Sequence, residues 1–185
     1  MLADLVIGRD VLGLSKLLLP ILAVFAATGC GRSAGASSGG SASSSNVLNY
    51  SFAGIEGEVV STNSNLGRVT VLLFVTTFDV SSQAQAKRLE DLYRTHVPRL
   101  NAVAIVVEAP RHVELARSFR DVLDLHFPVA MTEQRTLSRH PVLSGLPSIP
   151  AWVFLDRRGN LTGSAWGART PQELDEAVAR AEEGL

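Results

Sequence analysis

The feature that most constrains the fold is a continuous run of mainly β-branched and aromatic side chains at residues 68–78 (RVTVLLFVTTF). It lacks the polar alternation of a half-exposed strand, and is typical of a strand that is buried on both faces. A second run of this kind, residues 102–108 (AVAIVVE), follows a segment with helical spacing. Two such strands separated by a helix predict an α/β fold.

The segments around these two strands extend the same order. Residues 80–96 predict a helix that Pro98 ends, because Ala84, Leu89 and Leu92 fall on one face together with Tyr93. The order of strand, helix, strand, helix, two strands and helix indicates a mixed sheet. The remaining predicted elements are a hairpin or edge strands at 49–61, a helix at 111–125, strands at 127–131, 151–156 and 161–164, a short helix or turn near Leu137, a turn at 157–160, and a terminal helix from Pro171.

The only cysteine, Cys30, follows the small residues AATG at the end of an apolar stretch, residues 17–29. That stretch is shorter than the roughly 20 residues of a membrane-spanning helix. Small residues before a cysteine are typical of a lipoprotein signal, so we predict that residues 1–29 are a signal peptide and that Cys30 is lipidated. The alternative is an uncleaved anchor helix at 11–28. Both place the domain outside the cytoplasm, at a membrane.

The chain after Cys30 divides into a tether and one domain. Residues 31–46 are almost only Gly, Ser and Ala, which cannot bury enough apolar surface to offset the entropy of ordering. We therefore predict a lipidated cysteine and flexible tether at 30–46 and a single folded domain at 47–185. The net charge of −1 gives no basis for nucleic-acid binding.

Two stretches go beyond fold class: GIEGEVV (54–60) with LGRVTVLLFVTTF (66–78), and GLPSIPAWVFLDRRGNL (145–161). Together they resemble the thioredoxin-like superfamily, in particular its membrane-tethered TlpA and ResA type. The resemblance covers about residues 49–183 and implies a three-layer α/β sandwich, with a mixed central sheet and helices on both faces. It also implies that Pro150 is a cis-proline and that the backbone of Ile149 faces the site. An X-Pro bond permits cis, but a trans proline at the start of an edge strand is the alternative.

The resemblance aligns Asp79-Val80-Ser81-Ser82 with the Cys-x-x-Cys motif of the family. In a redox enzyme the first of these thiols benefits from the helix N-terminus, which favours the thiolate. Asp79 is suited to cap the same helix; the alternatives are a polar ligand contact or a role as general base or nucleophile. A nucleophilic Ser81 or Ser82 would need a base within hydrogen-bond reach, and the histidines belong to no recognisable nucleophile motif.

Neither a metal nor a cofactor is expected. A copper chaperone of this fold, as in the Sco type, uses two Cys and a His, and here only nitrogen and oxygen ligands would remain. His96, His112, His126 and His140 have no helical ligand spacing among themselves. Trp152 and Trp166 are expected to pack in the core. If either were exposed near Phe78 and the Ile149-Pro150 step, it would help to form an apolar groove for a peptide.

The sequence therefore predicts a lipid-anchored, thioredoxin-like binding or scaffold module of the cell envelope. Its expected groove consists of Phe78, Asp79, Ile149 and Pro150, and its partners are the membrane and a peptide or envelope protein. Gly31 replaces the Asp that signals inner-membrane retention in some bacteria, which favours the outer membrane, periplasmic side. The alternative is a thiol-disulfide oxidoreductase or peroxiredoxin by fold, with activity lost or independent of cysteine, because dithiol exchange needs thiols that the domain lacks.

Overall fold

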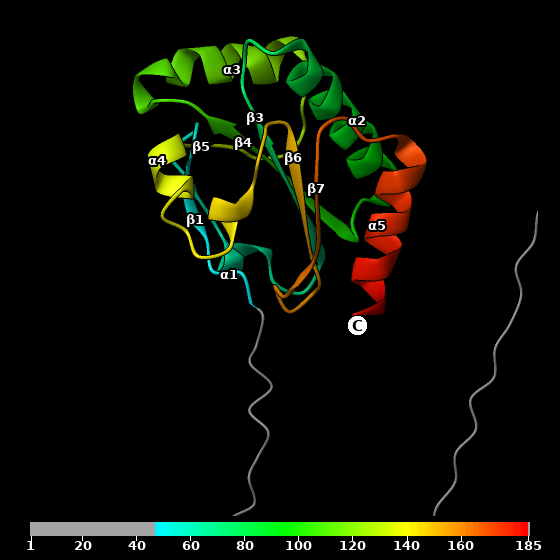
Figure 1. The fold of residues 1–185 in the computed structure, drawn as a ribbon. Helices are drawn as coiled ribbons and strands as arrows, with labels where there is room; N and C mark the ends of the chain where they lie inside the picture. The colour runs from blue at the N-terminus through cyan, green and yellow to red at the C-terminus, as the bar shows by residue number, and fades with distance from the viewer. Residues whose placement is uncertain (1–46, 185) are drawn as a thin grey trace, which may run out of the picture. The chain divides into compact units, whose positions relative to one another are not determined.

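A mixed seven-stranded sheet in the order β2-β1-β5-β4-β3-β6-β7 forms the centre of the structure, a computed structural model that describes residues 47–184 (Figure 1). The predicted signal peptide, Cys30 and tether lie outside these residues. β3, β4 and β5 are parallel, and the other neighbouring pairs are antiparallel. The strands are β1 (Ser51–Gly54), β2 (Val59–Ser61), β3 (Val69–Val75), β4 (Leu100–Val107), β5 (Val129–Thr132), β6 (Ala151–Leu155) and β7 (Leu161–Trp166).

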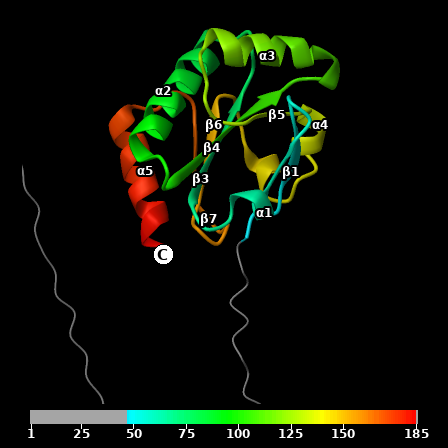
Figure 2. The ribbon, with the colours of Figure 1, turned by 180° about the vertical axis from the view of Figure 1, so that it is seen from behind.

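Helices cover both faces of the sheet, as the predicted three-layer sandwich requires. Alternate residues of β3 enter two separate cores: Leu73 packs with residues of α2, α3 and α5, whereas Phe74 packs with Leu137 and Leu143 of the opposite face. Figure 2 shows α2 and α5 side by side. The helices are α1 (Thr62–Asn65), α2 (Val80–His96), α3 (Val113–Val122), α4 (Gln134–Leu137) and α5 (Pro171–Glu183), with the 3-10 turns η1 (Pro110–His112) and η2 (Leu143–Gly145).

The predicted elements are present, with differences at their ends. α2 ends at His96, ahead of Pro98, as predicted. The helix predicted at 111–125 divides into η1 and α3 and ends three residues early, because Asp124 adopts a left-handed backbone with φ 52° that a helix cannot continue through. The sequence analysis missed α1, a single turn capped by Ser61. Among residues 47–184, no helix combines the length and the apolar character needed to cross a membrane.

The described chain enters the domain at the end of the sheet where β3 begins. Val47 forms a bridge with Asn160, and the Leu48 N–H donates to the Gly159 carbonyl over 2.9 Å. Asp156 holds this turn by accepting from the backbone N–H groups of Arg158 and Asn160, both at 2.8 Å. We call this end, with residues 157–160, the entry pole. The loop from β3 to α2 lies at the opposite end, which we call the α2 pole (Figure 1).

Candidate functional site at the start of α2

Asp79 caps α2, as the sequence analysis expected. Its carboxylate accepts from the backbone N–H groups of Ser82, at 2.7 Å, and Ser81, at 3.3 Å. Hydrogen bonds from Ser82 and Ser81 stabilise the charged form and lower the pKa of Asp79 below its ordinary value, against a smaller effect of burial. Two N–H groups of this first turn, those of Ser81 and Ser82, are therefore already bound by a side chain of the protein.

A buried carboxylate holds the loop that leads into α2. Glu108, the residue after β4, accepts from both the backbone N–H and the hydroxyl of Thr77, each over 2.7 Å. The Gln83 side chain donates to the Thr77 carbonyl at 2.9 Å, and the Thr76 N–H donates to the Ser82 hydroxyl at 3.3 Å. The sequence analysis includes Glu108 only as the end of a strand and assigns it no role. The feature that could have pointed to it is a charged residue directly after an apolar run.

Ser82 is fully buried, and its hydroxyl accepts from the Thr76 N–H. The four histidines have partners other than Ser82: His96 contacts Asp175, His112 contacts Glu108, His126 contacts Glu90, and His140 contacts the Asn49 carbonyl. The geometry therefore gives Ser82 no histidine base and places it as a structural residue. In the described part of the chain, no three His, Cys, Asp or Glu side chains gather as they would around a metal ion.

The Ile149–Pro150 peptide is cis, as the resemblance implied. β3 and β6 are antiparallel with Phe74 opposite Ala151, so this peptide lies beside the end of β3, where the loop to α2 begins. The Pro150 carbonyl accepts from the Gly167 N–H over 2.7 Å. The fold thus brings the start of α2 and the cis-proline to the same pole.

The four predicted groove residues share this pole, but Phe78 and Ile149 line two different hollows. Ile149 lines one hollow with Phe74 and Leu146. Phe78 lines another, of about 350 Å³, between the start of α2 and α3. We call this second one the α3 hollow; its lining residues are Thr77, Phe78, Gln83, Leu115, Ser118, Phe119, Val122 and Leu123, none of them charged.

The two tryptophans differ. Trp152 is fully buried and stacks on Phe154, so the prediction of core packing is confirmed for it. Trp166 is half exposed, so the prediction is wrong for that residue. It is the last residue of the edge strand β7 and lies opposite Ala151, next to the cis-proline. An exposed tryptophan therefore stands on the Ile149 side of the pole.

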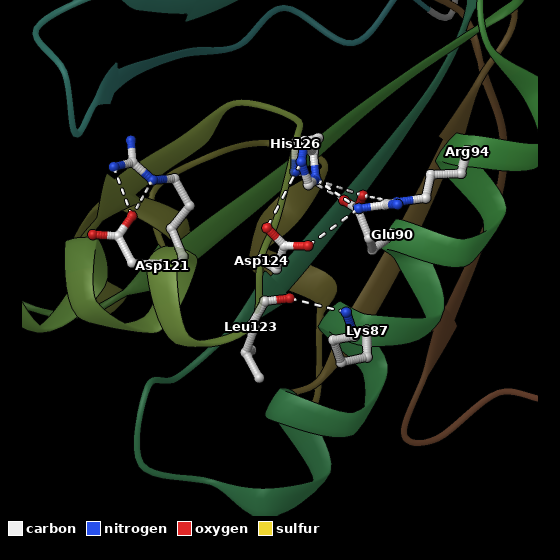
Figure 3. A network of polar contacts seen from close by, with 8 residues as sticks. Lys87, Glu90, Arg94, Asp121, Leu123, Asp124 and His126 are labelled. Carbon is white, nitrogen blue, oxygen red and sulfur yellow. Dashed lines mark hydrogen bonds and ion pairs between the residues drawn. The ribbon is translucent and has the colours of Figure 1, made fainter.

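A polar network fixes α3 against α2 and so shapes the α3 hollow (Figure 3). Lys87 donates to the carbonyl of Leu123, a hollow-lining residue, over 3.0 Å. Glu90, almost fully buried, accepts from the backbone N–H of His126 at 2.9 Å and from Arg94 Nε at 2.6 Å. Burial raises the pKa of Glu90, but the bonds from His126 and Arg94 outweigh it and leave that pKa below its ordinary value.

These features define the thioredoxin-like fold: a central mixed sheet, a capped helix after its first long strand, and a cis-proline beside that cap. No family model and no curated protein matches the chain. Solved structures do match it.

One match is a secreted disulfide oxidoreductase of Mycobacterium tuberculosis, homologous to E. coli DsbE, with 23% identity, a TM-score of 0.59, and coverage of 71% of this chain and 96% of that one. Another is a thiol:disulfide interchange protein of the thioredoxin family from Chlorobium tepidum, with 19% identity, a TM-score of 0.63, and coverage of 73% and 94%. StoA from Bacillus subtilis matches with 22% identity, a TM-score of 0.55, and coverage of 70% and 95%. At these identities the likeness establishes the fold alone.

Proposed function

We propose that the protein is a lipid-anchored, thioredoxin-like module of the cell envelope that binds a peptide or protein partner without thiol-disulfide chemistry. One observation carries the proposal: the α2 pole keeps its helix cap and cis-proline but has Asp79 and Ser82 at the aligned motif, and Cys30 is the only cysteine of the chain. Dithiol exchange needs a pair of thiols at one site. Residues 47–185 contain none.

The electrostatics of the pole favour an apolar contact over an anionic ligand. A helix N-terminus attracts anions, but Asp79 already fills this one, and Glu108 places a second carboxylate behind the loop. Around them, Phe78 and Val80 are 78% and 77% exposed. Large apolar side chains that remain exposed together mark surfaces where another molecule binds. An uncharged, apolar segment of a partner therefore fits this pole best.

Partner binding is tested by capture from an envelope extract. The wild-type chain is compared with a triple variant, Phe78→Ser, Asp79→Ala and Ile149→Ser, and with the control Val59→Ser, whose apolar side chain is exposed on β2, outside the predicted groove. We expect the triple variant to lose partners that wild type and control retain. Identical sets of partners from all three proteins would count against the site.

The alternative function is that of an oxidoreductase, which the names of the solved neighbours favour. It is tested by insulin reduction and disulfide oxidation with residues 47–185. Both hydrophobic cores of the structure consist of residues within 48–181, so this fragment contains everything that its fold packs. We expect no rate above background. Clear turnover would support the alternative.

Anchoring rests on the sequence around Cys30, which lies outside the described residues. We expect Cys30→Ser to leave the fold unchanged and to abolish incorporation of labelled fatty acid and retention in the membrane fraction. Fractionation of inner and outer membranes tests the preference for the outer membrane. A Cys30→Ser protein that remained in the membrane would instead support an uncleaved anchor helix.

A further inference from the structure

Exposed apolar side chains gather around the α3 hollow. Phe78, Leu115 and Val122 all line it and are 78%, 53% and 82% exposed. Val80, 77% exposed, is in the first turn of the same helix that Phe78 precedes. On α3, Ala116 and Phe119 fill the inward stripe, so Leu115 and Val122 are left outside the core. Such a patch on a soluble domain indicates a contact surface.

We propose that a second copy of this chain occupies the α3 hollow, with Phe78 of each copy entering the hollow of the other. A two-fold interface uses the same patch on both copies. That patch must therefore contain both a projecting side chain and a hollow that can hold the same side chain of the other copy. Here Phe78 projects at the edge of a hollow of about 350 Å³. No charged side chain lines the hollow, so an aromatic ring can enter it without burying a charge.

The predicted tether, residues 31–46, does not supply a better occupant. The described chain begins at Val47, at the entry pole, and the seven residues of β3 separate that pole from the α2 pole by about 23 Å (Figure 1). Residues 31–46 are long enough to cover this distance. Their side chains, however, are almost all those of Gly, Ser and Ala, and none is a large apolar group that could fill the hollow.

The proposed anchor makes a second copy the favoured occupant, and in this the inference rests on the proposed function. Lipid anchors confine copies to one surface, and Val47, where the described chain begins, lies at the end of the domain away from the α3 hollow. Confinement raises the effective concentration of one copy around another, so a patch of only a few side chains can pair there. That patch is small beside the roughly 800 Å² per partner of a standard interface, so the dimer depends on the membrane.

The test is photocrosslinking of the full chain in membranes. A benzoyl-phenylalanine replaces Ser118, which is exposed and lines the hollow, and two copies with different epitope tags are expressed together. We expect an adduct that carries both tags and that mass spectrometry maps to residues 77–80 of the second copy. Adding Phe78→Ser should lower its yield about tenfold or more, as for a central contact residue, while Val59→Ser leaves it unchanged.

The possible results separate this inference from the proposed function. An adduct with a different protein, and none between copies, would overturn the second copy as occupant and leave the binding function standing. The absence of any adduct from the folded, anchored chain would overturn both uses of this hollow. An adduct between copies that Phe78→Ser does not weaken would overturn the assigned geometry. Circular dichroism of Phe78→Ser checks that the fold is intact.

Discussion

The start and the middle of α2 both hold a carboxylate with a lowered pKa, but they use it differently. Asp79, at the start, lies partly exposed and accepts only from the first turn of its own helix. Glu90, in the middle, is buried and joins α2 to the segment after α3 through His126 and Arg94. The middle of α2 therefore holds the helix against the segment after α3, whereas Phe78 and Val80 at its start remain exposed. Substitutions of Glu90 should therefore lower the stability of the fold, and substitutions of Phe78 should affect the binding surface.

The largest expected effect is the loss of stability when Glu90 is replaced. Glu90→Ala removes the acceptor of the His126 N–H and of Arg94, and leaves those donors poorly paired around a cavity. We expect the free energy of unfolding of residues 47–185 to fall by about 2–4 kcal/mol, measured by urea denaturation. The neighbouring exposed Asp91→Ala is the matched control and should change it by less than about 0.5 kcal/mol. Equal, small effects of both substitutions would contradict the role of Glu90.

Low pH should reduce the stability of the folded domain in a way that depends on Glu90. Its pKa in the folded domain is below the ordinary 4.5, so its charged form stabilises the fold above that pH, and this stabilisation is lost as pH falls through the lowered pKa. The difference in unfolding free energy between wild type and Glu90→Gln should therefore be largest at pH 7 and should decrease below pH 4.5. A difference that stayed constant down to pH 2 would show that the charge of Glu90 contributes nothing.

A smaller effect is expected at the cap. Asp79→Ala leaves the Ser81 and Ser82 N–H groups without their side-chain acceptor, which should cost about 1 kcal/mol in thermal or urea unfolding. Asp79→Asn retains a capping oxygen and should stay within a few tenths of a kcal/mol of wild type. If Asn destabilised the domain as much as Ala, the charge, and not the cap, would be what α2 requires.

The smallest effect on stability is expected at Phe78. Its ring is 78% exposed, so Phe78→Ser should change the free energy of unfolding by less than about 0.5 kcal/mol. Val59→Ser, with a side chain 64% exposed on β2, should behave alike in unfolding but should not weaken binding. A loss of more than 1 kcal/mol from Phe78→Ser would mean that the ring stabilises the fold and is not free for a partner.

The buried strands could be predicted from the sequence, whereas the exposed apolar patch and the polar contacts between distant residues could not. The run at 68–78 became the fully buried β3 because a continuous apolar stretch has few other stable environments. Leu115 and Val122 fall within the helix predicted at 111–125, but the apolar spacing of a helix does not tell which of its apolar side chains will contact the rest of the domain. The partners of Glu108 and Glu90 lie 31 and 36 residues away in the chain, at Thr77 and His126, beyond any local pattern.

We infer that the α2 pole is a thioredoxin-like site without thiol chemistry, because residues 47–185 hold no cysteine. The most direct measurement compares insulin reduction by residues 47–185 of the wild type with that of the double variant Asp79→Cys, Ser82→Cys. We predict background rates for the wild type and measurable dithiol activity for the double variant, because the cysteines would return to the cap beside the cis-proline. Turnover by the wild-type domain, which has no cysteine, would show that the α2 pole carries out redox chemistry without thiols.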